Sequence, residues 1–235
     1  MTLNDPEVVR TEYATERGLE GRRAAYRYAD GPDAREVAFA AIAEGEPGRV
    51  LEVGAGPGEL AERIQGELGA TVVAVDISPR MVELARARSV DARVGDVRDL
   101  PFADGEFDCA VAAWMLYHVP DVPRALSELA RVLRQGGRLV AVTNSHRHLA
   151  ELYHLVGQRR PSYPFSAEDG EACLLPHFAR VERRDAHGWI NFPDRDAAQS
   201  FVDASASLFM RGRLPLRDGA VRVRRAPTIF VAEKA

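Results

Sequence analysis

The chain has 235 residues, of which 46% are hydrophobic and 28% charged; this is enough to bury one complete core, so we expect a single domain over residues 1–235. The net charge of −4 offers no general attraction to phosphate backbones, which makes nucleic acid an unfavourable partner. There are only two cysteines, no apolar run of transmembrane length and no secretory start, so we expect neither a disulfide framework nor a membrane protein, but a cytoplasmic one.

The segment before residue 46 is predicted to be helical. Helices are expected over residues 4–14, 20–28 and 33–43. Tyr26 and Tyr28, at the end of the second helix, could line a ligand pocket or pack in the core.

A glycine-rich turn follows at 49–60, with the sequence RVLEVGAGPGEL. An apolar run ends in glycines at alternate positions, Gly54, Gly56 and Gly58, and a helical pattern begins directly after them. This predicts a buried strand that turns sharply into a helix. Glycines allow positive φ and a close approach of the backbone to a ligand, so the turn is a candidate ligand cradle, although an ordinary turn without a ligand has the same pattern.

Acidic residues indicate which ligand this turn would hold. Asp76 ends the next predicted strand, over 71–75. A carboxylate at the tip of the neighbouring parallel strand is where an adenosine ribose presents its hydroxyls, either in a dinucleotide or in S-adenosylmethionine. Glu52 and Glu59 flank the glycines and would repel a pyrophosphate, whereas a cationic sulfonium ligand with an amino group tolerates or favours them.

The middle of the chain alternates between strand and helix patterns. Strands are predicted over 91–95, 107–113 and 138–143, and a helix over 121–134 is predicted to be capped by Gly136-Gly137. Ligands bind at the carboxyl ends of strands in an open parallel sheet, so the residues after these strands are site candidates. Asp96 follows the first strand, where it is a ligand contact or a simple turn residue. Tyr117 and His118 follow the second, and either could orient or deprotonate an acceptor.

The C-terminal half carries weaker patterns. We expect helices over 148–157, from 167 and over 195–209, and strands over 178–187 and 226–233. His146 and His148 are further pocket candidates, and each could equally be a surface residue. The arginines between 211 and 225 could meet an anionic acceptor or lie on a solvated edge. Four aromatic residues could form a substrate wall or part of the core: Trp189, Phe192, Phe201 and Phe209.

Four motifs together resemble those of the class I S-adenosylmethionine-dependent methyltransferases. They are VLEVGAGPG at 50–58, VVAVDISPRMVELAR at 72–86, VGDVRDLPFADGEFDCAVAAWMLYHV at 94–119 and RALSELARVLRQGGRLVAVT at 124–143. The resemblance covers residues 45–145 and points to the small-molecule group with a ubiquinone/menaquinone-type methyltransferase domain. It implies an α/β, Rossmann-like three-layer sandwich, with a seven-stranded mostly parallel sheet and an antiparallel C-terminal hairpin. Residues 1–45 would form a helical lid, 46–145 the cofactor-binding core and 146–235 the half with acceptor-binding elements.

The resemblance also implies roles for single residues. The lid would bring Tyr13 and Arg22 to the methionine carboxylate, with solvated helix faces as the alternative. Asp96 would accept from the adenine amino group, the Val97 amide would donate to a ring nitrogen, and Ile77 would pack on an adenine face. The expected cofactor contacts are Tyr13, Arg22, Glu52, Gly54, Gly56, Gly58, Asp76, Ile77, Met81, Asp96, Val97, Ala113 and Trp114, and the expected catalytic residue is His118.

The implied reaction is in-line transfer of the sulfonium methyl group to an O, N or C atom of a small molecule, such as a natural-product intermediate, leaving S-adenosylhomocysteine. Alignment alone can supply about 7–11 kcal/mol, so a strong base is optional. No metal-ligand cluster is visible in the sequence, and we expect no metal. An RNA or protein methyltransferase and a non-catalytic adenosylmethionine binder are the alternatives. We expect a monomer or homodimer that does not enter a membrane.

Overall fold

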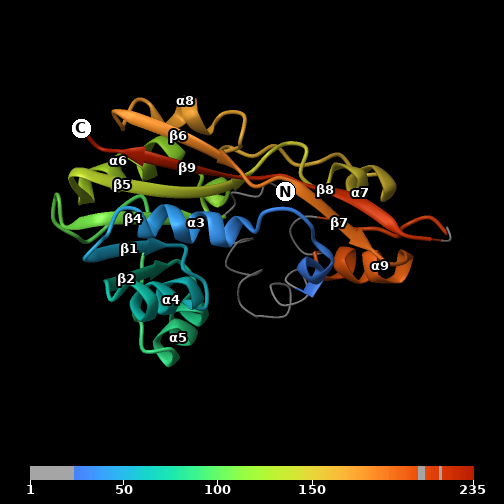
Figure 1. Cartoon of the computed structure of the whole chain (residues 1–235), viewed down its shortest axis with the longest axis horizontal. Coiled ribbons are helices and arrows are strands. Elements are labelled where there is room, and N and C mark those ends of the chain that lie inside the picture. The colour runs from blue at the N-terminus through green and yellow to red at the C-terminus, as the bar shows by residue number, and fades with distance from the viewer. Residues whose placement is uncertain (1–23, 206–209, 217–218) are drawn as a thin grey trace.

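The computed structural model describes residues 24–205, 210–216 and 219–235. Its centre is a seven-stranded sheet with the order β3-β2-β1-β4-β5-β9-β6 (Figure 1). The strands are β1 (Arg49–Val53), β2 (Thr71–Asp76), β3 (Asp91–Val94), β4 (Phe107–Ala113), β5 (Leu133–Asn144), β6 (Arg180–Asp185) and β9 (Pro227–Glu233). β9 runs antiparallel to both of its neighbours, while β1 to β5 pair in parallel. The predicted mostly parallel sheet with its antiparallel C-terminal pair is confirmed.

Helices cover both faces of this sheet and make three layers. One face carries α3 (Ala34–Ala43), α4 (Glu59–Leu68) and α5 (Pro79–Ala87), and the other carries α6 (Val122–Val132) and α8 (Gly170–Leu174). Alternate residues of β1 serve the two layers, since Val50 packs with α3 to α5 and Leu51 packs with α6. Both faces are buried, which explains why the central strands are continuous apolar runs that the sequence pattern predicts well.

The predicted cap of the helix before β5 is wrong. The helix α6 ends at Val132 and the chain enters β5 at once, so Gly136 and Gly137 lie inside the strand. The register between β4 and β5 shifts between Phe107 and Cys109, and the two glycines allow this irregularity. Gly136 has a φ of +69°, and a Cβ on Gly137 would lie 2.9 Å from the Arg134 carbonyl oxygen.

A second, two-stranded sheet was not predicted. It pairs β7 (Gly188–Phe192) with β8 (Val221–Arg225) and lies at one end of the molecule with α7 (Ala150–Leu155) and α9 (Arg195–Ala204) (Figure 1). The short 3-10 helix η1 (Ala25–Tyr28) packs against it and forms the end of the predicted helix 20–28. These elements share a core of their own that includes Leu152, Phe192 and Val223. The chain therefore carries a small subdomain, formed by β7, α9 and β8 between β6 and β9 together with η1 and α7 from earlier in the chain.

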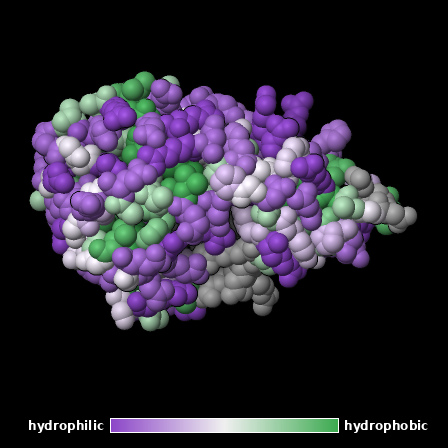
Figure 2. Space-filling model, in the orientation of Figure 1, coloured by the Kyte–Doolittle hydropathy of each residue, from purple (hydrophilic) through white to green (hydrophobic). Residues whose placement is uncertain are grey.

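The described residues expose few large hydrophobic side chains. The face in Figure 2 mixes hydrophilic surface with small, separate apolar groups. The large hydrophobic side chains that the described residues expose are Val94, Leu175 and Leu216. Nowhere in the described ranges is there a helix that is both apolar and long enough to cross a membrane.

Candidate functional site

A cavity of about 530 Å³ opens at the carboxyl ends of the central strands. It runs from the tips of β1 and β2 to the subdomain, because its walls include Gly54 and Asp76 at one end and Tyr153 and Phe201 at the other. The predicted residues that line it are Glu52, Gly54, Gly56, Asp76, Ile77, Asp96, Val97, Ala113, Trp114 and His118. Among the expected cofactor contacts that the structure describes, only Gly58 and Met81 do not line the cavity, and Tyr13 and Arg22 lie outside the described residues.

The three glycines of the turn do different things. Gly54 and Gly56 line the cavity with φ values of +65° and +56°, and a Cβ on Gly54 would lie 2.6 Å from the Met115 side chain. Gly58 begins α4 with a φ of +80°, and a Cβ there would lie 2.9 Å from the Ala85 Cα atom. The close approach of α4 and α5 therefore accounts for the glycine at position 58.

Replacing Gly58 with alanine is expected to lower the free energy of unfolding by about 2–4 kcal/mol, because overpacking and an unfavourable φ act together. Gly66 is the matched control: it lies in the same helix, and a methyl group added there would meet no atom within 4 Å. Gly66→Ala should raise stability slightly. Denaturant unfolding measures both, and equal effects would contradict this packing role.

Glu52 is a buried carboxyl group at the cavity wall. It is 3% exposed, and its Oε2 atom has no hydrogen-bond partner among the residues that the structure describes. Burial, and then the nearby Asp76 carboxylate, raise the pKa of Glu52 to about 8. A cationic ligand in the cavity would favour the ionised form of Glu52 and could contact the unpartnered oxygen.

Asp76 joins the tip of β2 to the glycine turn. Its Oδ2 atom accepts from the Gly56 amide at 2.8 Å, and its Oδ1 atom accepts from the Ser78 amide at 2.8 Å. Burial raises the pKa of Asp76, while these backbone N–H groups act in the opposite direction. Each carboxylate oxygen has a second lone pair, so Asp76 can hold the turn and still accept from a ligand. Ile77 lies beside it on the cavity wall.

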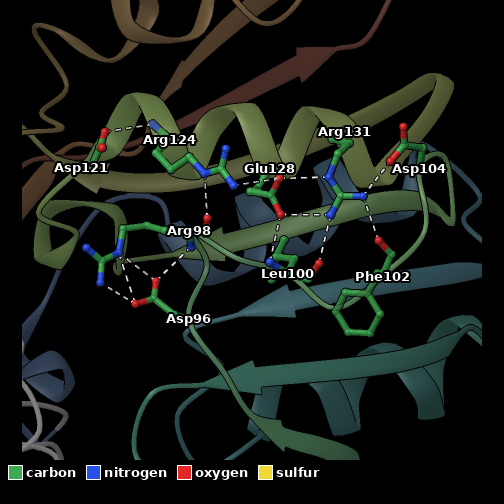
Figure 3. A network of polar contacts seen from close by, with 9 residues as sticks. All are labelled: Asp96, Arg98, Leu100, Phe102, Asp104, Asp121, Arg124, Glu128 and Arg131. Carbon is green, nitrogen blue, oxygen red and sulfur yellow. Dashed lines mark hydrogen bonds and ion pairs between the residues drawn. The ribbon is translucent and has the colours of Figure 1, made fainter.

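Asp96 lines the cavity but is not free there. Its carboxylate accepts from the Arg98 amide at 2.9 Å and from the Arg98 guanidinium at 2.6 Å (Figure 3). The next residue, Val97, is buried. The expected adenine contact would therefore have to share the carboxylate with Arg98.

Helix α6 fastens the loop that carries Asp96 (Figure 3). The buried Glu128 side chain accepts from the Leu100 amide and from Arg131 Nε, both at 2.9 Å. Arg131 in turn donates to the carbonyl oxygens of Leu100 and Phe102. The Arg131 guanidinium lowers the pKa of Glu128, so the carboxylate is the stable form.

Glu128→Ala is expected to lower the free energy of unfolding by about 2–4 kcal/mol, because a buried amide and an arginine lose their partner. Ser127→Ala, on the exposed side of the same helix, is the control. We expect Glu128→Gln to fall between them, since the amide oxygen can still accept from Leu100. Thermal and denaturant unfolding compare the three, and a Glu128→Ala variant as stable as the control would refute this role.

The end of β4 brings a strained backbone to the cavity. Trp114 has a φ of +55°, which is rare for a bulky side chain, and its amide donates to the Val142 carbonyl oxygen at 2.9 Å. His118 follows in the short helix η2 (Leu116–His118), is 9% exposed and packs its ring 4.5 Å from that of Tyr117. Ala113, Trp114 and His118 therefore border one part of the cavity.

The far end of the cavity holds residues outside the predicted contact set. His148 and Arg225 line it, together with Asn144 at the end of β5. Of the two histidines that are pocket candidates by sequence, His148 is the one at the cavity; His146 lies outside the lining and faces Glu168 and Asp169 instead. The alternation in VRVRR at 221–225 could have revealed a strand that turns Arg225 inward.

Two other groups of predicted residues are placed by the structure. Phe201 lines the cavity, whereas Phe192 is core and Trp189 packs against Arg222 outside the cavity. Tyr26 lines the cavity, and Phe209 lies outside the described residues. Within the described ranges, no three His, Cys, Asp or Glu side chains gather as a metal site would require.

The known proteins that this chain resembles in sequence include methyltransferases. A family model described as a methyltransferase domain matches residues 51–141. A ubiquinone/menaquinone biosynthesis C-methyltransferase of Geobacter is 35% identical over 51% of this chain and 57% of its own length. A demethylmenaquinone methyltransferase of Mycobacterium is 34% identical over 74% of this chain and 81% of its own length. The chain thus spans little more than half of the first relative and four-fifths of the second.

Solved structures show the same fold at low identity. A possible histamine N-methyltransferase of Thermotoga maritima has a TM-score of 0.59 at 22% identity, with 92% of this chain and 95% of that chain covered. A phosphoethanolamine N-methyltransferase of Haemonchus contortus, solved with S-adenosylhomocysteine, has a TM-score of 0.65 at 18% identity. The match covers 100% of this chain and 60% of that chain.

Proposed function

We propose that this chain, which belongs to the class I S-adenosylmethionine-dependent methyltransferase family, transfers a methyl group from S-adenosylmethionine to an O, N or C atom of a small molecule. One observation carries the proposal. A buried Glu52 with an unpartnered oxygen, a glycine edge with positive φ and the Asp76 carboxylate meet at one end of a single cavity.

These residues fit the cofactor by their chemistry. Asp76 would accept from the ribose hydroxyls, and Asp96 and Val97 would meet the adenine edge. Glu52 would lie on the side of the positive charge, with Ala113 and Trp114 beside the methionine part. When bound, S-adenosylmethionine supplies an electrophilic methyl group on a sulfonium, and S-adenosylhomocysteine is the product.

The contribution of the protein would be position and exclusion of water. The cavity walls would hold the acceptor in line, and a lid that includes Tyr13 and Arg22 would close over the site. Because α3 packs on the central sheet, the proposed lid is the part of residues 1–45 that precedes α3. His118 would orient the acceptor or take its proton. The proposed division is a lid, a cofactor core over 46–145 and acceptor-binding elements over 146–235. We propose a monomer or homodimer.

The named relatives favour an acceptor with an oxygenated ring. Besides the two quinone-pathway relatives, a probable tocopherol O-methyltransferase of rice is 36% identical over 48% of this chain. Methylation of an RNA or protein, or cofactor binding without catalysis, are the competing functions. RNA binding would weaken steeply with salt, whereas small-molecule binding would not.

Calorimetric titration of the purified protein with S-adenosylmethionine, S-adenosylhomocysteine and NAD tests the proposal. We expect micromolar binding of both sulfur compounds and none of NAD. Methyl transfer from labelled S-adenosylmethionine to a panel of phenols, quinols, amines and acids follows. Absence of binding by both sulfur compounds would refute the proposal, and binding without transfer to any acceptor would favour the non-catalytic function.

A further inference from the structure

We propose that the far end of the cavity is an anion subsite in which Arg225 holds the carboxylate of the methyl acceptor and His148 donates a hydrogen bond beside it. The acceptor would be a small organic acid with an apolar body. The inference rests on the proposed function, because it assigns the subsite to the methyl acceptor.

Arg225 occupies a position that the strand pattern reserves for an apolar side chain. On β8, Val221 and Val223 face the core of the subdomain, and Arg225 continues the same face two residues later. The whole residue is only 2% exposed. Burying a guanidinium is costly unless an opposite charge meets it, so its partners decide what it is for.

Those partners leave the charge without a counterion among the residues that the structure describes. Arg225 Nη2 donates to the carbonyl oxygens of Asp30 at 2.9 Å and Pro32 at 2.5 Å, and Nε has no partner among the described residues. The Asp30 carboxylate senses this charge but bonds the Trp189 amide and Asn191 instead. Across the described ranges, no carboxylate forms an ion pair with Arg225. An anion in the cavity would supply the missing charge.

His148 is fixed as a neutral donor. Its Nδ1 atom accepts from the Ala226 amide at 3.0 Å, so the ring proton is on Nε2. Burial and the positive charges of Arg160 and Arg225 lower the pKa of His148 to about 3, which keeps the ring neutral. Nε2 bonds no other residue that the structure describes. His148 would therefore donate to an acceptor oxygen and could not take a proton through that nitrogen.

Further unsatisfied polar atoms lie nearby. Arg160 donates from Nη1 to the Ser145 carbonyl oxygen, while its buried Nε and Nη2 atoms lack partners in the described part of the chain. The Oδ1 atom of Asn144, which lines the cavity, is buried and also without a partner there. Arg160 itself lies outside the cavity lining, with its guanidinium 4.7 Å from the ring centre of Tyr163, which does line the cavity. Buried polar groups are normally satisfied, so the unpartnered Asn144 oxygen, in the same cavity as Arg225 and His148, indicates a polar ligand.

The side chains next to Arg225 and His148 indicate the chemical character of the remainder of the ligand. Tyr163, Phe201 and Met210 line the same end of the cavity, and the Tyr163 ring lies 5.1 Å from that of Tyr117. These surfaces favour an apolar, flat body next to the charged group.

Two competing roles for Arg225 can be separated by experiment. Its guanidinium could serve only to tie residues 30–32 to β8, or it could hold the carboxylate of S-adenosylmethionine itself. We compare Arg225→Gln, Arg225→Lys and His148→Asn with Arg222→Gln, an exposed arginine on the same strand. In His148→Asn the side-chain oxygen can still accept from Ala226, while the Nε2 donor is lost.

The first measurement is calorimetry with S-adenosylhomocysteine and with 5′-methylthioadenosine, which lacks the amino acid. We expect all variants to bind both compounds as the wild type does. A selective loss of S-adenosylhomocysteine binding in Arg225→Gln would overturn the proposal, because the carboxylate held would then be that of the cofactor. Failure of the wild type to bind either compound would refute the proposed function. The anion subsite would then be tested by the next measurement alone, with neither compound present.

The second measurement is ligand-observed NMR with matched acids and amides: benzoate and benzamide, 4-hydroxybenzoate and its amide, 2-naphthoate and its amide. We expect the wild type and Arg222→Gln to bind acids at least about ten-fold more tightly than amides. Arg225→Gln should abolish that preference, Arg225→Lys should retain part of it, and His148→Asn should reduce binding of both members of a pair.

No preference for acids in the wild type, or a preference unchanged in Arg225→Gln, would overturn the proposal. If Arg225→Gln does not fold, the test rests on Arg225→Lys and His148→Asn. The proposal would be overturned if both variants kept the wild-type preference for acids and the wild-type affinity.

Discussion

Asp76→Ala is expected to weaken binding of S-adenosylhomocysteine by at least about 100-fold, because charge-assisted hydrogen bonds are worth roughly 1.5–3 kcal/mol each and two ribose hydroxyls would lose their acceptor. The same change removes the acceptor of the Gly56 and Ser78 amides. The glycine turn then loses the bond that ties it to β2. Titration calorimetry gives the affinity, and thermal unfolding reports whether the fold survives.

Asp91→Ala is the matched control. Asp91 is an exposed carboxylate at the start of β3, and this amino end of the strand lies opposite the carboxyl ends that border the cavity. It should bind the cofactor as the wild type does. Asp76→Asn keeps one acceptor oxygen for the backbone and loses the charge, so its affinity should lie between the two. An Asp76→Ala variant with undiminished affinity would remove this residue from the site and weaken the proposed function.

The second large effect is a fall in stability with rising pH that originates at Glu52. The ordinary pKa of a glutamate is 4.5, and burial raises that of Glu52 to about 8 in the folded chain. Below pH 4.5 both the folded and unfolded states hold the proton. Between these two values only the folded state holds it, so stability falls as pH rises, by roughly 5 kcal/mol in all, and levels off above the folded pKa.

Glu52→Gln isolates this effect, because the amide mimics the protonated carboxyl at every pH. The variant and the wild type should be equally stable near pH 4.5 and diverge by up to about 5 kcal/mol at pH 8, with the variant the more stable. Glu83→Gln, an exposed change on α5, should track the wild type throughout. Denaturant unfolding at several pH values measures the difference, and parallel curves for Glu52→Gln and the wild type would contradict it.

The central sheet could be predicted because its strands are buried on both sides. Runs such as 50–53 and 107–113 are mostly apolar and short, so the pattern is typical of a strand buried on both faces. Each run ends at a residue that lies on the cavity wall. The site residues at the strand ends followed from this topology. Gly58 shows the limit: spacing cannot distinguish a glycine that faces a ligand from one that lies against Ala85, which belongs to the next helix.

The subdomain was harder to predict from the sequence, because its two strands are short and one of them carries three arginines. In β8 two apolar residues alternate with arginines, a pattern that also suits a solvated edge. The alternation allows a strand that turns Arg225 inward, but it is the pairing with β7 that distinguishes this from a solvated edge, and local sequence does not specify the pairing of distant segments. The same holds for His148, whose tautomer depends on the amide of Ala226, 78 residues later in the chain.

The two ends of the subdomain meet at one point of the sheet. The Ala186 amide donates to the Pro227 carbonyl oxygen at 3.1 Å, and Asp185 pairs with Thr228 across β6 and β9. The cost of closing a loop rises only slowly with its length, so residues 186–226 can be shortened, extended or exchanged while both strands stay in register. A replacement segment would have to cover both η1 and α7, which pack against residues 186–226 from outside this range. With that condition met, the acceptor specificity could change by exchange of one continuous stretch of the gene.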